Sequence, residues 1–187
     1  EYAGVFDEAA SNFEMKLAQF VDWYLFSRPL RNVGMSPIAL QVERDVMPSE
    51  EDEKRYLVNL SNNRHSLFEF IKISKDDLHV RDLFSGYKLT IKDSPVVHGF
   101  DTSEPFEGRL IPHGDSFIFA SAFCFHPKEA TKYIQQEVKR VKKLSDDERP
   151  KAREELLLKL FRMRHKYDQY SHVAVDEIYT NEPRMKF

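Results

Sequence analysis

The sequence predicts an α+β fold in which N-terminal helices, a small antiparallel sheet and a C-terminal helical hairpin follow one another. Apolar residues recur every three to four positions in the first and last thirds of the chain, as on one face of a helix. In the middle third they recur at every second position, as on one face of a strand. The chain has 187 residues, 41% of them hydrophobic, which suffices for one domain of ordinary size.

The first third is expected to form three helices. Apolar side chains within residues 13–25 fall on one helix face, and Pro29 helps to end that helix. Ser36 and Pro37 are typical of a helix start, with serine as the cap and proline at the first helical position. Ser49 is expected to begin a third helix, because the acidic residues that follow it are favoured by the helix dipole.

The middle third is expected to form five short antiparallel strands. The clearest alternation covers residues 87–91, and turns at 75–77, 85–86 and 113–115 separate neighbouring strands. The last strand is expected to run unbroken over residues 116–125. Strands this short bury best as a small, partly closed β-barrel of the SH3 or OB type, or as a curled sheet.

The last third is expected to form an antiparallel helical hairpin. Its first helix opens after Pro127, and Ser145 with Glu148 has the spacing of a capping box that starts the second. An extended tail follows. The predicted segments, sharing one compact unit, are 1–62 (helical), 63–126 (barrel), 127–168 (basic hairpin) and 169–187 (tail). The expected core consists of Phe13, Leu17, Phe20, Leu25, Leu67, Val80, Leu89, Leu110, Phe119, Ile134, Leu157 and Leu160.

Five segments of the chain resemble a known family. They are FSRPL at 26–30, HSLFE at 65–69, VRDLFSG at 80–86, FEGRLIP at 106–112 and SAFCFHP at 121–127. Over about residues 13–130 this succession is similar to an uncharacterised bacterial family whose members often carry a SEC-C zinc motif. The resemblance implies a bacterial protein and names no activity. This chain has one cysteine, so it departs from the family by lacking the cysteine cluster of that motif.

The sequence lacks the patterns that are typical of several classes of protein. One cysteine excludes an intramolecular disulfide framework and a multi-cysteine zinc site. No apolar run approaches the ~20 residues that a membrane span needs. The six glycines form no Gly-x-Gly or Walker pattern, and no Gly-x-Ser-x-Gly motif occurs. We therefore expect a cytoplasmic protein that uses no cofactor and contacts no membrane.

Cys124 and His126 form a Cys-x-His pair. Residues two apart on a strand share a face, so the two side chains are expected to be neighbours, and His113 or Asp115 on the preceding turn could approach them. Two functional interpretations stay open, a metal site and a nucleophilic Cys–His enzyme. The sequence favours a third, a buried cysteine within an aromatic strand, and assigns no catalytic or metal-binding residue.

Charge is divided unevenly along the chain. Residues 1–125 carry 13 Lys/Arg against 20 Asp/Glu, whereas residues 126–167 carry 13 against 7. The candidate residues for binding an anionic partner in the basic hairpin are Lys132, Lys139, Arg140, Lys143, Arg162 and Lys166. A second candidate surface on the sheet carries Arg81, Lys88, Thr90 and Arg109. For Arg109 the sequence favours a structural alternative, a cross-strand ion pair with Asp82.

These patterns together predict a non-enzymatic binding or regulatory module that acts through a protein partner or a ribonucleoprotein. Direct binding of RNA or DNA by the basic hairpin is the alternative, because such a stripe of cations can neutralise phosphates. An enzyme built on Cys124 and His126 is a second, less favoured alternative. The basic residues of the hairpin could also be a solvated helix face that binds nothing. The uneven division of charge along the chain also allows a homo-oligomer, in which basic and acidic parts of two copies attract each other.

Overall fold

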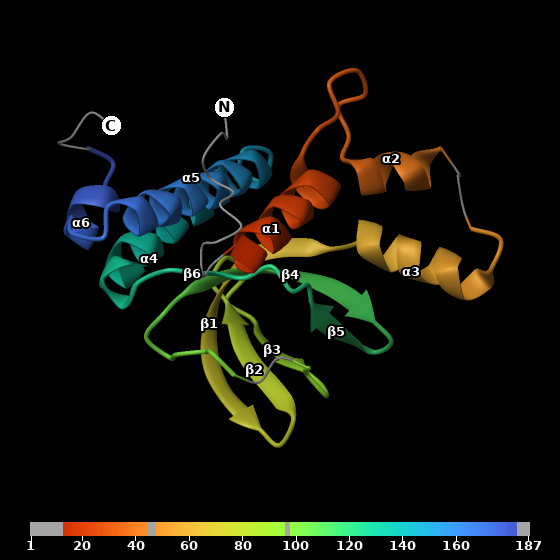
Figure 1. The fold of residues 1–187 in the computed structure, drawn as a ribbon, viewed down its shortest axis with the longest axis horizontal. Coiled ribbons are helices and arrows are strands. Elements are labelled where there is room, and N and C mark those ends of the chain that lie inside the picture. Colours follow the sequence, from red (N-terminus) through yellow and green to blue (C-terminus); the bar gives the residue numbers. More distant parts are fainter. Residues whose placement is uncertain (1–12, 45–47, 96–97, 183–187) are drawn as a thin grey trace. The chain divides into compact units, whose positions relative to one another are not determined.

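The computed structural model describes residues 13–44, 48–95 and 98–182, and it contains helices and a curled antiparallel sheet, as the α+β prediction expects (Figure 1). The chain groups into two compact units. The first unit comprises Glu1–His65 and Gly108–Phe123, and the second comprises Ser66–Glu107 and Cys124–Phe187. Two strands of the sheet contribute residues to both units.

The first helix of the first unit forms where the period of its apolar residues predicts it. α1 (Phe13–Asp22) continues into a π-helical segment, η1 (Trp23–Ser27), and the helix ends before Pro29. Leu17 and Phe20, both expected in the core, are 42% and 39% exposed. A helical period specifies which side chains share a face, but it does not specify whether another element covers that face.

The next two helices start close to their expected caps. α2 (Pro37–Glu43) has proline at its first position, and the Ser36 hydroxyl accepts a hydrogen bond of 3.4 Å from a backbone N–H of the first turn. α3 (Glu51–Ser61) begins with three acidic residues, although its cap is Glu50 and not Ser49.

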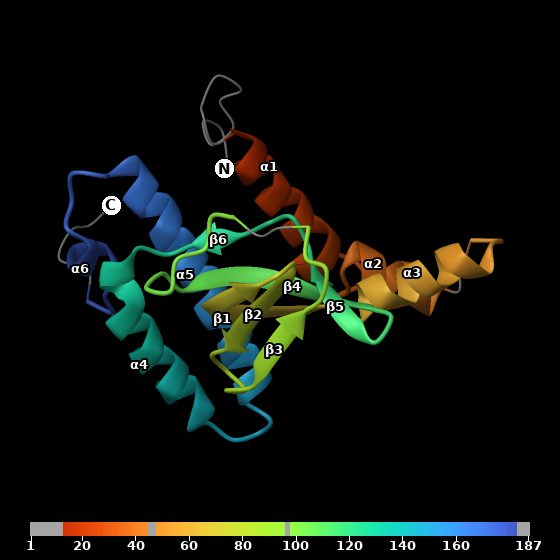
Figure 2. The same cartoon turned by 90° about the horizontal axis from the view of Figure 1, so that it is seen from below.

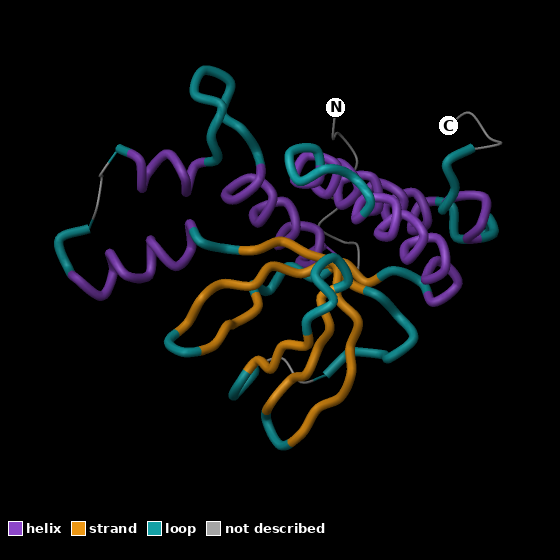
Figure 3. The backbone as a smooth tube through the Cα atoms, turned by 180° about the vertical axis from the view of Figure 1, so that it is seen from behind, coloured by secondary structure: helices purple, strands orange, loops and turns teal. Residues whose placement is uncertain are grey.

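The sheet consists of β1 (Arg64–Ser74), β2 (Asp77–Asp82), β3 (Lys88–Ile91), β4 (Phe106–His113), β5 (Ser116–Phe119) and β6 (Cys124–Phe125). The strand order is β3-β2-β1-β4-β5, and β6 pairs with β4. Figure 3 shows these strands in orange and the helices in purple. The expectation of one unbroken strand over residues 116–125 is wrong, because the chain leaves the sheet after Phe119 and returns as β6. The break leaves Phe119 and Phe123 in contact, with ring centroids 5.3 Å apart.

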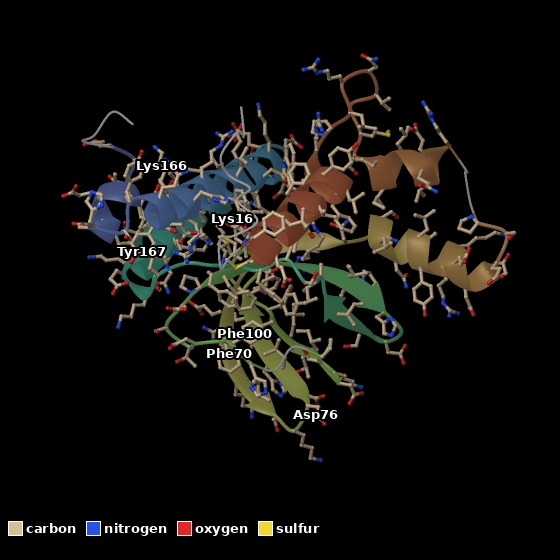
Figure 4. The ribbon with its side chains drawn as sticks, viewed as in Figure 1. Lys16, Phe70, Asp76, Phe100, Lys166 and Tyr167 are labelled. Atoms are coloured by element: carbon tan, nitrogen blue, oxygen red, sulfur yellow. The ribbon has the colours of Figure 1, made fainter. Side chains whose placement is uncertain are left out.

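Strands β1, β2 and β3 belong mainly to the second unit and form a curled antiparallel meander. The register of β1 shifts between Phe70 and Lys72, and such a bulge bends a strand and increases its twist. Phe70 stacks on Phe100 with a centroid separation of 5.7 Å, and Asp76 lies in the turn between β1 and β2 (Figure 4). Leu78 projects inward and is fully buried.

The C-terminal part of the second unit is the expected helical hairpin. A short 3₁₀ turn, η2 (Lys128–Ala130), leads into α4 (Thr131–Lys142), which packs against α5 (Arg149–Gln169) (Figure 2). Buried side chains of both helices, among them Ile134 and Leu160, form one cluster with side chains of neighbouring segments. The expected core positions that are buried are Leu67, Val80, Leu110, Phe119, Ile134, Leu157 and Leu160.

Two details of the hairpin differ from the sequence prediction. The Ser145 hydroxyl donates a 2.7 Å hydrogen bond to the Glu148 carboxylate, and α5 begins only after Glu148, so the expected capping box does not form. The tail is not wholly extended, because it contains a one-turn helix, α6 (Val175–Ile178). Ile178 and Tyr179 are buried against the hairpin helices, which supplies the apolar contacts that hold this turn in place.

Gly108 tests the packing of the first unit. A Cβ atom at this position would lie 3.1 Å from the ring of Phe119, closer than ordinary van der Waals contact. We expect Gly108→Ala to lower the free energy of unfolding by about 1–3 kcal/mol, the usual cost of overpacking a core. Denaturant unfolding measures this change. Gly99→Ala is not a suitable control, because Gly99 has a positive φ that alanine would strain. The control is Ala120→Gly, which exchanges the same two residue types at a half-buried position. An unchanged midpoint for Gly108→Ala would contradict this packing.

Candidate functional site

Three lysines form a stripe along the exposed side of α4 and its C-cap residue, Lys143. Lys132, Lys139 and Lys143 are spaced seven and four residues apart, which places them within an arc of about 40° and over a length of about 16 Å. All three are exposed, and none forms an ion pair with another residue in the described parts of the chain. The buried residues Ile134 and Val138 lie on the opposite side of the helix. We call these three residues the lysine stripe.

Arg140, which the sequence groups with these lysines, has a structural partner. Its guanidinium lies 3.2 Å from the carboxylate of Glu137, a residue buried at the hairpin interface. Lys159 of α5 lies 3.4 Å from the same carboxylate, and Asn181 donates a hydrogen bond of 3.1 Å to it. Two cations and an amide therefore compensate the buried charge of Glu137, and Arg140 is engaged within the hairpin.

The remaining hairpin candidates lie on α5. Arg162 is exposed, whereas Lys166 is half-buried and has partners of its own. Figure 4 labels both Lys166 and Tyr167 near the C-terminal end of α5. Arg164, which the sequence does not single out, pairs with Asp168 at 3.2 Å. The α5 cations therefore do not form a second continuous stripe of unpaired charge.

The candidate surface on the sheet is only partly present. Arg81 and Lys88 are register partners on β2 and β3, and Arg81 forms a cross-strand ion pair of 3.6 Å with Glu69 on β1. The Thr90 hydroxyl lies 2.9 Å from Nδ1 of His79. Arg109 does not contribute to an exposed surface, because it is 3% exposed.

Arg109 is the centre of a buried polar cluster in the first unit. Its Nε and Nη2 donate to the carboxylate of Asp22 at 2.9 and 2.8 Å, and Nη2 also donates to the hydroxyl of Ser27 at 2.8 Å. Nη1 donates to the side-chain oxygen of Asn63, and the guanidinium carbon lies 4.8 Å from the ring centroid of Phe26. The two-pronged contact with Asp22 is the strong geometry for an arginine–carboxylate pair.

The expected ion pair between Arg109 and Asp82 is therefore wrong. Asp82 instead accepts hydrogen bonds from the backbone N–H groups of Phe84 and Ser85, at 2.8 and 3.0 Å, and closes the turn after β2. Arg109 instead pairs with the carboxylate of Asp22, which lies 87 positions away in the sequence. Sequence reasoning considered only charged residues on nearby strands and so missed Asp22, Ser27 and Asn63.

The contrast between Arg109 and Arg81 gives a stability prediction. Removing the Arg109 guanidinium with Arg109→Met leaves the largely enclosed carboxylate of Asp22 (side chain 12% exposed) without its cation, so we expect a loss of about 3 kcal/mol in the free energy of unfolding. Arg81→Met removes an exposed ion pair and should cost about 0–1 kcal/mol. Denaturant unfolding of both variants measures the difference. Equal losses would contradict a structural role for Arg109.

Cys124 and His126 lie together in the second unit, as their spacing predicts, and a third group joins them. Glu107 on β4 is the register partner of Cys124 on β6. Nε2 of His126 lies 3.1 Å from Oε1 of Glu107, and Nδ1 lies 3.0 Å from the hydroxyl oxygen of Tyr179. The side chains of all four residues are buried, with His126 fully inaccessible.

Burial also sets the acid–base properties of this cluster. Desolvation, with a further contribution from the negative charge of Glu107, raises the pKa of the Cys124 thiol well above its usual value. Desolvation likewise raises the pKa of the Tyr179 hydroxyl. Both groups are therefore protonated at neutral pH when nothing else binds them, which is the opposite of what an activated nucleophile needs.

Two of the four residues were not predicted from the sequence. Glu107 reads as an ordinary polar position in a strand, and Tyr179 lies in the tail, far from Cys124 along the chain. The sequence carries no signal for either residue, because β4 is buried from Phe106 to Ile111 even though Glu107 and Arg109 within it are charged. His113 and Asp115, the other expected neighbours of Cys124, are exposed residues of the first unit.

The buried thiol gives a second prediction. In the native chain we expect Cys124 not to react with a soluble aromatic disulfide reagent, because the sulfur is inaccessible and not activated. After unfolding in guanidinium chloride, one thiol per chain should react. Absorbance of the released reagent measures both states. Rapid, stoichiometric reaction of the native protein would contradict the burial of this side chain.

Comparison with known proteins identifies a family but no activity. Residues 4–173 match a family described as a family of unknown function (DUF7986). No curated protein and no solved structure matches the chain. Within the described residues, no helix combines the length and the apolar character needed to cross a membrane. The chain belongs to this family of unknown function, which confirms the resemblance to an uncharacterised family, while a SEC-C motif is not part of what the match shows.

Proposed function

We propose that this member of a family of unknown function is a non-enzymatic binding module of the bacterial cytoplasm, and that its lysine stripe binds an acidic surface. The observation that carries this proposal is the stripe itself, three exposed cations in line on one helix without acidic partners among the described residues. The favoured partner is a protein or a ribonucleoprotein with a row of negative charges that can face α4.

The position of the stripe supports recognition by a rigid element. α4 is held by its buried face, where Ile134, Val138 and Val141 pack into the core of the hairpin. The lysines on the opposite side therefore project from a helix whose backbone is already ordered. A partner that binds a preorganised surface loses less conformational entropy than one that must order a loop.

The buried cluster around Cys124 supports a function without catalysis. A nucleophilic mechanism needs an accessible, activated thiol with a neighbouring base, whereas the sulfur of Cys124 is buried and its pKa is raised. The imidazole of His126 is positioned by Glu107 and Tyr179 and is fully inaccessible. This arrangement is suited to holding segments together.

Charge reversal tests the lysine stripe. We expect the triple variant Lys132→Glu, Lys139→Glu, Lys143→Glu to elute from a heparin column at much lower salt than the native chain, because the stripe supplies the cations that a polyanion contacts. The matched control reverses three exposed lysines that are dispersed over the chain, Lys72, Lys92 and Lys151, and so changes the net charge by the same amount.

A control variant that elutes as early as the stripe variant would contradict a specific role for α4. Fluorescence anisotropy with labelled RNA and DNA then separates the partner classes. Nucleic-acid binding by the native chain, with a salt slope that falls by about 0.9 for each lysine reversed, would make direct nucleic-acid recognition the function. Light scattering of both variants tests whether the acidic partner is a second copy of the chain.

A further inference from the structure

Strands β4 and β6 bring three metal-ligating side chains to one place. Glu107 and Cys124 face each other across the antiparallel pair, and His126 shares a strand face with Cys124 because it lies two residues further on. A carboxylate oxygen, the thiol sulfur and an imidazole nitrogen all lie within 4.8 Å of one another. The Cys-x-His pair and the cross-strand carboxylate thus place three different metal-binding groups at one point.

The two faces of this strand pair differ in chemistry. Phe106 and Phe125, the other register partners, contact each other with ring centroids 5.6 Å apart, and both contact Phe100. The donor side chains occupy the opposite face, where Glu107 is 2% and Cys124 4% exposed. The donors are therefore shielded from bulk water, as is usual for the ligands of a structural metal ion.

We propose that Glu107, Cys124 and His126 bind one zinc ion in a structural site. Zinc is bound in proteins by thiolate sulfur, imidazole nitrogen and carboxylate oxygen, and these three donor types are present together here. A thiolate and a carboxylate also balance the double positive charge of the ion, so the filled site is neutral. This inference goes beyond the proposed function, because it concerns the interior of the second unit and not the lysine stripe.

One pair of donors already has nearly the spacing of a zinc site, and the sulfur of Cys124 lies within 4.8 Å of both. Nε2 of His126 and Oε1 of Glu107 are 3.1 Å apart, and two donors of a tetrahedral zinc site with bond lengths of about 2.1 Å are separated by about 3.4 Å. Zinc would therefore take the place of the proton between these two atoms. The second carboxylate oxygen of Glu107 can fill the fourth position, which keeps the site closed, as in a structural zinc site.

Tyr179 has the position of a residue that orients a metal-bound histidine. Its hydroxyl oxygen lies 3.0 Å from Nδ1 of His126, so Nδ1–H can donate to it while Nε2 binds the metal. The ring of Tyr179 also meets the imidazole edge-on at a centroid distance of 5.9 Å. Because Tyr179 follows α6, a metal on His126 would stabilise the contact between the C-terminal tail and β6.

Cobalt(II) titration of the metal-free chain tests the site. We expect one cobalt ion to bind per chain, with the near-ultraviolet absorption band of a cobalt–thiolate bond, and zinc to displace it. Cys124→Ser should lose this band. The matched control is His113→Asn, which removes an exposed imidazole of the first unit and should keep both the band and the stoichiometry.

Two further measurements do not depend on the folding of the Cys124 variant. Addition of zinc to the metal-free native chain should raise Tm, because an ion that binds only the folded state stabilises it. Tyr179→Phe should lower zinc affinity about 10–100-fold, as loss of an orienting partner does in known sites. A native chain that binds neither cobalt nor zinc at one ion per chain, or a folded Cys124→Ser that keeps the cobalt–thiolate band, would overturn the proposal.

Discussion

Strand β4 carries two buried residues of opposite charge, and each of the two units must supply polar partners for one of them. Glu107 and Arg109 lie in a strand stretch that is buried from Phe106 to Ile111. An ionised group in the interior loses its hydration, and the protein must replace it with partners of good geometry. Polar side chains from other segments of the chain must therefore lie next to Glu107 and Arg109 in the folded protein.

Each unit meets this constraint with its own set of partners. In the first unit, the carboxylate of Asp22 and the side chain of Asn63 approach Arg109 from segments that are far away in the sequence. In the second unit, His126, which directly follows β6, approaches Glu107. Gly108, between the two charged residues, leaves space for the ring of Phe119. Two of the buried charged residues of the described chain, Glu107 and Arg109, thus lie two positions apart on β4, while the lysine stripe lies on the surface of α4.

Local features of the fold could be predicted from the sequence, and long-range partners could not. The cap at Ser36, the tight turn at Gly114 and the helical hairpin depend on residues a few positions apart, so their patterns were sufficient. The same holds for the lysine stripe, which follows from helical spacing alone. The sequence predicts Asp82 as the partner of Arg109 because the two residues are expected on adjacent strands, whereas the observed partner, Asp22, comes from α1. Nothing in the alternation of β4 distinguishes a buried glutamate from an exposed one.

Hydrogen–deuterium exchange of Glu107→Ala and Arg109→Ala tests most directly whether these buried charges organise the two units separately. We predict that Arg109→Ala accelerates amide exchange in α1, α3 and β5 and leaves α4 and α5 at native rates. Glu107→Ala should accelerate exchange in β6, α4 and the segment around Tyr179, and leave α1 and α3 unchanged. Uniform acceleration across the chain in both variants, or native rates throughout, would contradict the role assigned to β4.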